Sequence, residues 1–490
     1  ADTCAHAIVD RPQQREAAVN TSAPNILFIL IDDMGWTDLS CCGSEYYETP
    51  RIDSLCADGM RFTDAYAACP VCSPTRASVL TGKYPATVGI TDWIHWGDAR
   101  PAPRGRVIDV PYLKQLPTSE HTVAAALRDG GYQTWHVGKW HLGAEDHRPQ
   151  DHGFDVNVGG CHMGSPGRGG YFSPWTIEPL VDADVPEGTY LTDYLTDHVV
   201  DLIDGADERP FFLNLWYYSV HTPIQAKQER VAYYEQKARD LGLDQLETFT
   251  EDEYYPCDHK KDQRVRRRLL QSDAVYAAMI DSLDENIGRI LDALGAAGTS
   301  EDTLILFTSD NGGLATSEGS PTCNAPLAEG KGWMYEGGTR EPLFVRWPGK
   351  VAPGSVCNTP VTSPDVYPTL LAAAGLAPIP DQHVDGENLL PLLEQSADLE
   401  RQSIFWHYPH YGNQGGTPGS SIRCGDWKLI EFFDDGRREL YNLRHDIGEN
   451  DNRVEAELEI TADLHRQLAT WRESVAAKIP VPNPDWEKSR

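Results

Sequence analysis

The chain of 490 residues has no apolar run that approaches the roughly 18 residues of a membrane span. Its 11 cysteines are too sparse for a disulfide scaffold, and no second pair accompanies Cys69 and Cys72 to complete a zinc site. Basic residues are also few, since 42 Lys and Arg against 74 Asp and Glu leave a net charge of −32. The sequence therefore predicts no membrane span, and it disfavours nucleic acid and anionic membrane surfaces as partners.

Positive charge is concentrated in one short cluster, Arg264 to Arg268, which we predict to lie on the solvated face of a helix. A strongly acidic protein that binds an anion must gather Lys, Arg, His or a metal ion into a local positive pocket. The chain begins with Ala1 instead of Met, which leaves the compartment open: the location is periplasmic or secreted if a leader was removed. A cytoplasmic location is the alternative.

Four continuous apolar segments have the length and composition of buried parallel strands, and helical periodicity lies between them. The helical segments, His121 to Arg128 and Gln263 to Leu294, would cover the sheet. Polar residues follow all four strands, and ligands of open α/β sheets bind at that edge. We therefore expect one crevice beyond the ends of Asn25 to Ile31, Gly131 to Val137, Pro210 to Val220 and Thr303 to Thr308.

The sequence divides into three predicted parts: a polar extension (1–23), a large α/β domain with a mostly parallel central sheet (24–375), and a smaller α+β subdomain (376–490). The subdomain contains a predicted helix from Glu455 to Lys478. Its predicted short sheet consists of Ser403 to Tyr408, Trp427 to Phe433 and Glu439 to Leu443.

Cys72 opens a segment that carries helix start and stop signals. Ser73 is the predicted N-cap, Pro74 occupies the first helical position, and Gly82 ends the helix. Cys72 would then lie at the positive end of the helix, where Arg76 can also reach a bound anion. From these local features alone, a plain structural thiol is the alternative.

Two further groups of residues follow the predicted strands. The first has only oxygen-bearing side chains, which suits a hard cation, although such residues also form turns: Asp32, Asp33, Asp310 and Asn311. The second is cationic or titratable and could hold an anion, with surface lysines and core histidines as the alternative: Lys139, His141, His221 and Lys331.

The segment Cys-Ser-Pro-Thr-Arg-Ala-Ser-Val-Leu-Thr-Gly, residues 72–82, resembles the signature of formylglycine-dependent type I sulfatases, among them bacterial carbohydrate sulfatases and arylsulfatases. The resemblance implies an alkaline-phosphatase-like α/β sandwich fold. It also implies that a formylglycine-generating or other maturation enzyme converts Cys72 to formylglycine. By the same resemblance, calcium would be bound by Asp32, Asp33, Asp310, Asn311 and an oxygen of the converted residue 72 or of the substrate.

The resemblance also implies hydrolysis of a sulfate ester. Arg76, Lys139 and Lys331 would stabilise the charge on sulfate, His221 would protonate the leaving group, and His141 would act as a base. The segment His407 to Tyr411 resembles bacterial sulfatases that act on galactose-type sugars, so we expect a sulfated galactose or N-acetylgalactosamine and exo action. Candidate sugar contacts, for which structural packing is the alternative, are Asp92, Trp93, His95, Trp96, His407, His410 and Arg423.

Two rival functions remain open at this level. A phosphomonoester or phosphonate-ester hydrolase of the same superfamily would accept a substrate of the same tetrahedral shape. The oxygen ligands suit one metal, however, and no His-rich two-zinc cluster is recognisable in the sequence. The other rival is a protein that binds sulfated glycans without cleaving them because Cys72 stays unconverted.

Overall fold

The computed structural model describes residues 23–95 and 104–486, so nearly all of the predicted polar extension lies outside the described residues. Its largest element is a nine-stranded sheet with the order β11-β2-β10-β9-β1-β6-β4-β5, with β12 beside β2. Only β10 runs antiparallel to its neighbours, which confirms the mostly parallel sheet. The strands are β1 Asn25–Ile31, β2 Met60–Tyr66, β4 Gln133–Gly138, β5 Val156–Val158, β6 Phe211–Trp216, β9 Thr303–Ser309, β10 Arg340–Arg346, β11 Ser355–Cys357 and β12 Val361–Thr362.

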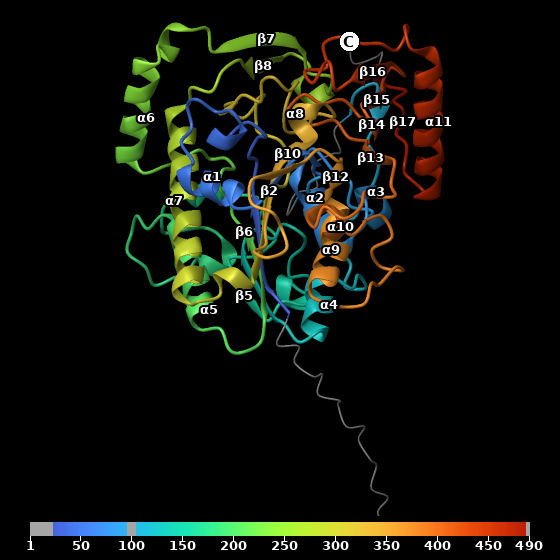
Figure 1. Ribbon diagram of the computed structural model, residues 1–490. Helices are drawn as coiled ribbons and strands as arrows, with labels where there is room; N and C mark the ends of the chain where they lie inside the picture. Colours follow the sequence, from blue (N-terminus) through green and yellow to red (C-terminus); the bar gives the residue numbers. More distant parts are fainter. Residues whose placement is uncertain (1–22, 96–103, 487–490) are drawn as a thin grey trace, which may run out of the picture.

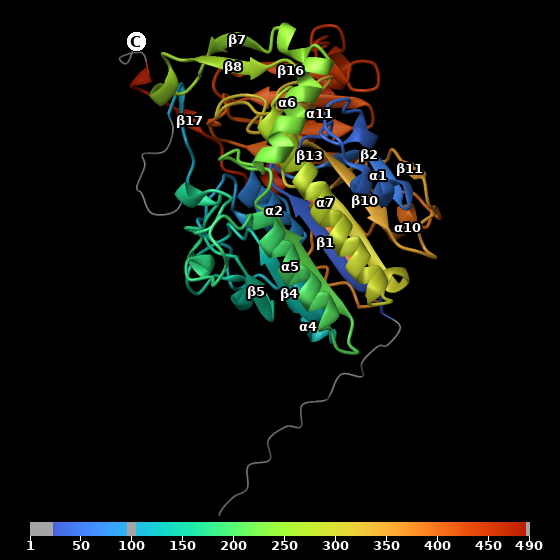
Figure 2. The same ribbon diagram turned by 90° about the vertical axis from the view of Figure 1, so that its left-hand side faces the viewer.

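Helices cover both faces of this sheet, as Figures 1 and 2 show. Alternate residues of β1 enter different cores: Leu27, Ile29 and Ile31 pack on one side, and Ile26, Phe28 and Leu30 on the other. A strand that is apolar on both faces is what such a sandwich requires. The first face carries α1 Pro50–Ala57, α5 Leu191–Asp204, α6 Gln228–Asp240 and α7 Ala274–Ala296; the second carries α2 Cys72–Thr81, α3 Pro85–Val88, α4 Val123–Asp129, α9 Val366–Ala373 and α10 Leu390–Leu393.

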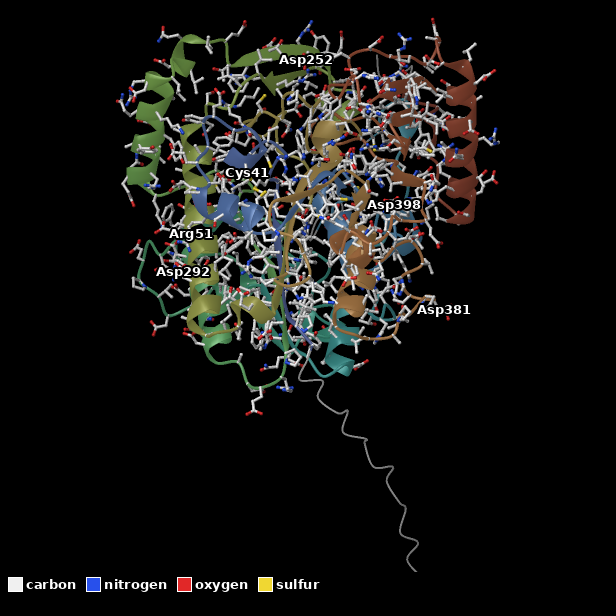
Figure 3. The ribbon with its side chains drawn as sticks, in the orientation of Figure 1. Cys41, Arg51, Asp252, Asp292, Asp381 and Asp398 are labelled. Carbon is white, nitrogen blue, oxygen red and sulfur yellow. The ribbon has the colours of Figure 1, made fainter. Side chains whose placement is uncertain are left out.

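Side chains join these helices to one another as well as to the sheet. Arg51 of α1 and Asp292 of α7 form an ion pair at the surface, with 2.5 Å between Nη2 and Oδ1 (Figure 3). Asp284 of α7 accepts hydrogen bonds from the first backbone N–H groups of α1, at Arg51 and Ile52. These N–H groups have no partner within α1, so the carboxylate fixes the start of the helix.

The C-terminal part forms a separate four-stranded antiparallel sheet, with α11 Leu458–Ser474 packed on one face. This confirms the predicted α+β subdomain, but strand β14 was not predicted because its sequence, Gly-Ser-Ser-Ile-Arg-Cys, is poor in strand-forming residues. The boundary after residue 375 stays a prediction, and α10 beyond it packs in the core of the larger domain. The four strands are β13 Ser403–Tyr408, β14 Gly419–Cys424, β15 Trp427–Phe432 and β16 Arg438–Asn442.

The basic cluster differs from the prediction, because Arg264–Arg268 is strand β8, paired antiparallel with β7 (Phe249–Tyr254). Val265 between two exposed arginines is buried, which is the alternation of a strand. The helix expected from Gln263 instead begins at Ala274, where the Asp273 side chain caps it by accepting from the N–H groups of Val275 and Tyr276. A further small pairing joins β3 (Val107–Ile108) to β17 (Val481–Pro482). Within the described residues, no helix combines the length and apolarity needed to span a membrane.

Candidate functional site

The four strands predicted to end at a common crevice are neighbours in the sheet, in the order β9-β1-β6-β4. Strands β9, β1, β6 and β4 are mutually parallel, so their carboxyl ends lie at one edge. Asp32 and Asp33 follow β1, Asp310 and Asn311 follow β9, and Lys139 follows β4. The sheet thereby brings together residues that lie 277 positions apart in sequence, as the hydrogen bond from the Asp33 N–H to Asp310 Oδ1 shows (3.2 Å).

Helix α2 places Cys72 at its first residue, so Cys72 does lie at the positive end of the helix. The predicted N-cap is wrong, because Val71 occupies that position and makes no side-chain cap. Pro74 is therefore the third residue of the helix and not, as predicted, the first. The Ser73 hydroxyl instead donates to the His141 carbonyl and accepts from the Ile94 N–H, both at 3.0 Å. Ser73 therefore joins the helix to two loops of the site. Gly82 ends the helix in the left-handed conformation, as predicted.

Cys72 and His141 face each other in the buried part of the site, with 3.3 Å between Sγ and Nδ1. His141 Nε2 lies 2.8 Å from the Ile94 carbonyl oxygen, which can only accept a hydrogen bond. In the neutral ring the proton is therefore on Nε2, and Nδ1 accepts from residue 72. Burial lowers the pKa of His141 and raises the pKa of the Cys72 thiol, so both groups are neutral.

The oxygen-bearing residues form a buried cluster in which every residue is at most 1 % exposed: Asp32, Asp33, Asp310 and Asn311. Asn311 Nδ2 donates to Asp33 Oδ1 at 2.8 Å. Among the described residues, Asp32 Oδ1 and Asn311 Oδ1 are buried without a hydrogen-bond partner. Two buried acceptors without a donor, beside two further carboxylates, form an arrangement that suits a bound cation.

Three cationic side chains balance the three carboxylates of this cluster. Lys139 Nζ lies 2.6 Å from Asp32 Oδ2, and Lys331 Nζ lies 2.7 Å from Asp33 Oδ2. Arg76 Nη2 lies 2.7 Å from Asp310 Oδ2.

The pKa values of the two neighbouring aspartates move in opposite directions. Burial raises the pKa of Asp32 well above its ordinary value, although Lys139 counteracts the effect. Burial acts in the same direction on Asp33, but the nearby charges of Lys331 and Lys139 bring its pKa below the ordinary range. Asp33 is therefore ionised at neutral pH.

His221 joins the cluster from the segment after β6. Its Nε2 lies 3.6 Å from Asp33 Oδ2, and its Nδ1 lies 2.7 Å from the Thr222 carbonyl oxygen. Burial, with the charge of Lys331 nearby, lowers the pKa of His221 to about 3. The ring is therefore neutral, with its proton on Nδ1 and its Nε2 facing the carboxylate.

A cavity of about 420 Å³ opens above residue 72 and is large enough for a sugar-sized group. It contains several residues that the sequence analysis missed, because they belong to loops without a sharp motif. The lining consists of Val71, Cys72, Trp93, Ile94, His95, His141, His162, Met163, Gly164, Ser165, His221, Glu318, Lys331, Asn413 and Gln414. Arg76 and Lys139 are fully buried and do not line it.

The predicted sugar contacts do not all reach this cavity. Trp93 lines it, whereas Asp92 is buried and accepts a hydrogen bond from the Tyr408 hydroxyl at 3.1 Å. His407 contacts Ser420 Oγ at 2.7 Å and the Lys478 carbonyl at 3.0 Å. His410 pairs with Asp109 and lies 2.8 Å from Thr91 Oγ1.

The structure therefore places His407 and His410 inside the protein, with both ring nitrogens of each engaged. Arg423 lies in a second cavity, of about 430 Å³, where it pairs with Asp64 at 2.6 Å. The loop that follows β13 does reach the cavity above Cys72, but through Asn413 and Gln414. Trp96 lies outside the described residues.

Comparison with known proteins identifies the family. The family model "Sulfatase" matches residues 24–376, and the model "N-sulphoglucosamine sulphohydrolase, C-terminal" matches residues 329–474. A sulfatase of Formosa agariphila is 31% identical, with 95% of this chain and 91% of that protein covered. The N-acetylgalactosamine-6-sulfatase of Mus musculus is 32% identical, with 80% of this chain and 70% of that protein covered.

Among solved structures, Ps i-CgsB in complex with k-i-k-neocarrahexaose is 29% identical, with a TM-score of 0.71 and 92% of both chains covered. The fold, the signature around Cys72 and these relatives agree. The chain belongs to the sulfatase family, which places it among the sulfuric ester hydrolases of the alkaline-phosphatase-like superfamily.

Proposed function

We propose that this sulfatase removes sulfate from a sulfated carbohydrate of galactose or N-acetylgalactosamine type by exo action, with formylglycine at position 72 and one calcium ion. One observation carries the proposal: Cys72 starts a helix beside a buried set of three carboxylates and one amide, in which two oxygens lack a partner. The family is generally dependent on formylglycine and a metal, and the residues of this chain fit both.

The metal proposal rests on the chemistry of the donor set. Asp32, Asp33, Asp310 and Asn311 would hold the ion through oxygen atoms only, which favours a hard cation such as calcium over zinc. Bound calcium would supply positive charge that stabilises an anionic ester and acidifies a nearby hydroxyl. The carboxylates that now pair with Lys139 and Lys331 could then bind the ion, and Lys331, which lines the cavity, would be left for the substrate.

Residue 72 would supply the nucleophile. The Cys72 Sγ atom marks the place of a hydroxyl oxygen of hydrated formylglycine, which would attack sulfur as the bond from sulfur to the alcohol oxygen breaks. Loss of the proton from the second hydroxyl would then expel sulfate and restore the aldehyde. His141 Nδ1, 3.3 Å from Sγ, accepts a proton from residue 72 in this arrangement. Its orientation is fixed because Nε2 is held by the Ile94 carbonyl.

The cationic residues divide into two roles by exposure. Lys331 and His221 line the cavity and would contact the sulfate ester, whereas Arg76 and Lys139 act from behind as buried positive charges. His221 donates from Nδ1 to Thr222, so only its Nε2 can protonate a leaving alcohol. A bound sulfate anion would raise its pKa and favour the imidazolium form that this step needs.

The carbohydrate part of the proposal rests on the outer cavity and on the relatives. Trp93 offers an aromatic face, and Asn413 and Gln414 offer amides, the groups that commonly contact sugar rings. The mouse relative is an N-acetylgalactosamine-6-sulfatase, and the solved relative Ps i-CgsB holds a neocarrahexaose.

The two rivals make different demands on the site. A two-zinc phosphatase needs several histidines around the metals, and none of the three side-chain clusters among the described residues that could hold a metal contains more than one. A glycan-binding protein without activity would need neither a base beside residue 72 nor its conversion. Both remain outcomes of the experiment below.

The test combines intact mass with sulfate release. In a preparation made with a maturation enzyme, the mass should fall by the replacement of –CH2SH with –CHO at residue 72, and sulfate should be released from defined sulfated monosaccharides. Cys72→Ala should abolish release, whereas Cys357→Ala, on β11 away from the site, should keep it. Full activity of unconverted protein would contradict the formylglycine proposal, and hydrolysis of phosphate esters alone would favour the phosphatase rival.

A further inference from the structure

Among the described residues that line the cavity above Cys72, Glu318 is the one carboxylate. A cavity that receives an anionic ester gains nothing from a negative charge at its wall, because like charges repel in a partly desolvated site. Glu318 belongs to the loop that follows β9, which also supplies Asp310 and Asn311. Its presence there needs a reason other than binding sulfate.

The backbone holds Glu318 in an uncommon conformation. Ser317, Glu318 and Ser320 have φ values of +63°, +48° and +45°, in the left-handed region that residues other than glycine rarely adopt. Such a conformation costs free energy at each residue, so surrounding contacts must impose it. Contacts with neighbouring segments therefore determine the conformation of this part of the cavity wall.

Contacts from two other segments supply that constraint. Gln414, in the loop between β13 and β14, donates from Nε2 to Glu318 Oε1 at 3.2 Å and is only 4 % exposed. Lys260, between β7 and β8, donates to the Asn413 carbonyl at 2.6 Å and lies 3.5 Å from Ser317 Oγ. Trp333 Nε1 donates to Thr316 Oγ1 at 3.0 Å. These bonds tie the Glu318 loop to the subdomain loop at the mouth of the cavity.

The Glu318 carboxylate keeps most of its capacity to accept hydrogen bonds. Within the described part of the chain, no Lys, Arg or His nitrogen lies within the 4.0 Å of an ion pair, and the Gln414 amide is its only hydrogen-bond donor. A carboxylate can accept about four hydrogen bonds. Glu318 is exposed, and it lines the cavity in which the sugar of a sulfate ester would lie.

We propose that Glu318 selects the sugar ring: it accepts a hydrogen bond from a hydroxyl or amide N–H beside the sulfate ester, and it repels a second sulfate or a carboxylate on that ring. The favoured substrate is then a sugar unit that carries one anionic group and a free donor next to it. This inference rests on the proposed carbohydrate sulfatase function and restricts the class of sugar that the enzyme accepts. Gln414 is a positioning residue in this arrangement, since it orients the carboxylate.

The test compares two probes that differ by one sulfate, N-acetylgalactosamine 6-sulfate and N-acetylgalactosamine 4,6-disulfate, with the converted, calcium-loaded enzyme. Wild type should prefer the monosulfate in kcat/KM for release of the 6-sulfate. Glu318→Gln keeps the shape and removes the charge, so the preference should fall at least about tenfold, through slower reaction of the monosulfate and faster reaction of the disulfate. Glu301→Gln, an equal charge change at a residue with a 79 % exposed side chain outside the cavity, should leave the preference unaltered.

Three outcomes would overturn the inference. A preference in Glu318→Gln within about threefold of wild type would show that the charge does not select the ring. An equal loss on both probes would assign Glu318 a structural role. Wild-type protein that releases sulfate from an aryl sulfate but from neither sugar would instead reject the carbohydrate proposal itself, and the inference with it.

Discussion

The surroundings of Cys72 determine what this residue can do. Burial raises the pKa of its thiol, so at neutral pH an unconverted Cys72 is protonated and is a poor nucleophile. The same surroundings favour a hydroxyl at this position, since His141 Nδ1 is placed to accept its proton. Loss of activity without maturation is therefore the expected behaviour of this site.

Asp310 links the proposed metal to the rest of the site. Asp310→Asn keeps the side-chain shape but removes one of three carboxylate charges and leaves Arg76 without its strongest partner. We expect calcium to be lost and turnover to fall by more than about 100-fold, since even outer-shell changes cost 10- to 100-fold at metal sites. Metal analysis and sulfate release would measure both effects.

Thermal unfolding gives a readout independent of activity. Calcium at about 100 times its Kd should stabilise wild type by about 2.7 kcal/mol, and the variant should gain much less. Asp381→Asn, at the exposed residue labelled in Figure 3, is the matched control and should respond like wild type. An Asp310→Asn variant that retains stoichiometric calcium would remove Asp310 from the ligand set.

His407 is expected to affect stability and not sugar recognition. Burial lowers its pKa to about 3, while an unfolded histidine titrates near 6.5. Below pH 6.5 the unfolded chain therefore binds a proton that the folded chain does not, and stability falls as the pH decreases from about 6.5 towards 3.

A His407→Gln variant isolates this contribution from those of the other titrating groups. The stability advantage of wild type over the variant should shrink by about 2 kcal/mol between pH 7 and pH 5, as measured by urea unfolding. The variant should lose equal activity on sugar and aryl sulfates. A parallel pH dependence of both proteins, or a loss confined to the sugar substrate, would contradict this assignment.

At the scale of elements, helix α2 holds the nucleophile and is fixed at its C-terminal end by Gly82. The φ of Gly82 is +68°, and an added Cβ would lie 2.4 Å from the Cβ of His383 and 2.8 Å from its Cα. Gly242 has nearly the same φ, +69°, but open space around it. The two glycines therefore separate conformational cost from steric cost.

Gly242→Ala should destabilise the protein by about 1–2 kcal/mol, the cost of left-handed backbone at an L-residue. Gly82→Ala should cost an additional 1–3 kcal/mol, roughly the penalty of overpacking, because the residue 383 backbone must move. Urea unfolding of both variants measures the difference. Equal destabilisation would mean that the end of α2 adapts freely and does not fix the position of Cys72.

At the scale of the whole molecule, a buried ionic network joins the two sheets. Lys428 of β15 lies 2.9 Å from Glu336 Oε1 and 3.0 Å from Glu449 Oε1, and all three side chains are fully buried. Glu336 belongs to α8 (Glu336–Thr339), next to β10 of the large sheet, and also binds Arg340 at 2.7 Å. The C-terminal subdomain is thus fastened near the loops that complete the cavity.

Lys428→Met should destabilise the protein by about 3–5 kcal/mol, because it leaves two buried carboxylates without their shared cation. Lys350→Met removes a surface lysine that lies 3.2 Å from Glu394 and should change stability by at most about 1 kcal/mol. Urea unfolding would compare the two. A loss at Lys428 as small as that at Lys350 would show that the network does not hold the subdomain in place.

The sequence by itself determined the central part of the site. Buried parallel strands are recognisable from continuous apolar runs, and their carboxyl ends must share one edge, so the sequence alone predicts that Asp32, Asp310 and Lys139 converge. The position of Cys72 at the start of a helix was equally local, since Pro74 lies in the first turn of that helix and Gly82 ends it.

Only the tertiary structure decided which loop residues face the cavity. Glu318 and Gln414 lie 96 positions apart and meet because the loop after β9 packs against the loop after β13, a contact that no local pattern encodes. His407 was predicted to contact a sugar, but it lies on β13 and its ring contacts Ser420 of the neighbouring strand β14. Strand ends are positioned by hydrogen-bonded ladders that follow from local sequence, whereas loop side chains are positioned by packing between distant segments, and for that reason their roles required the structure.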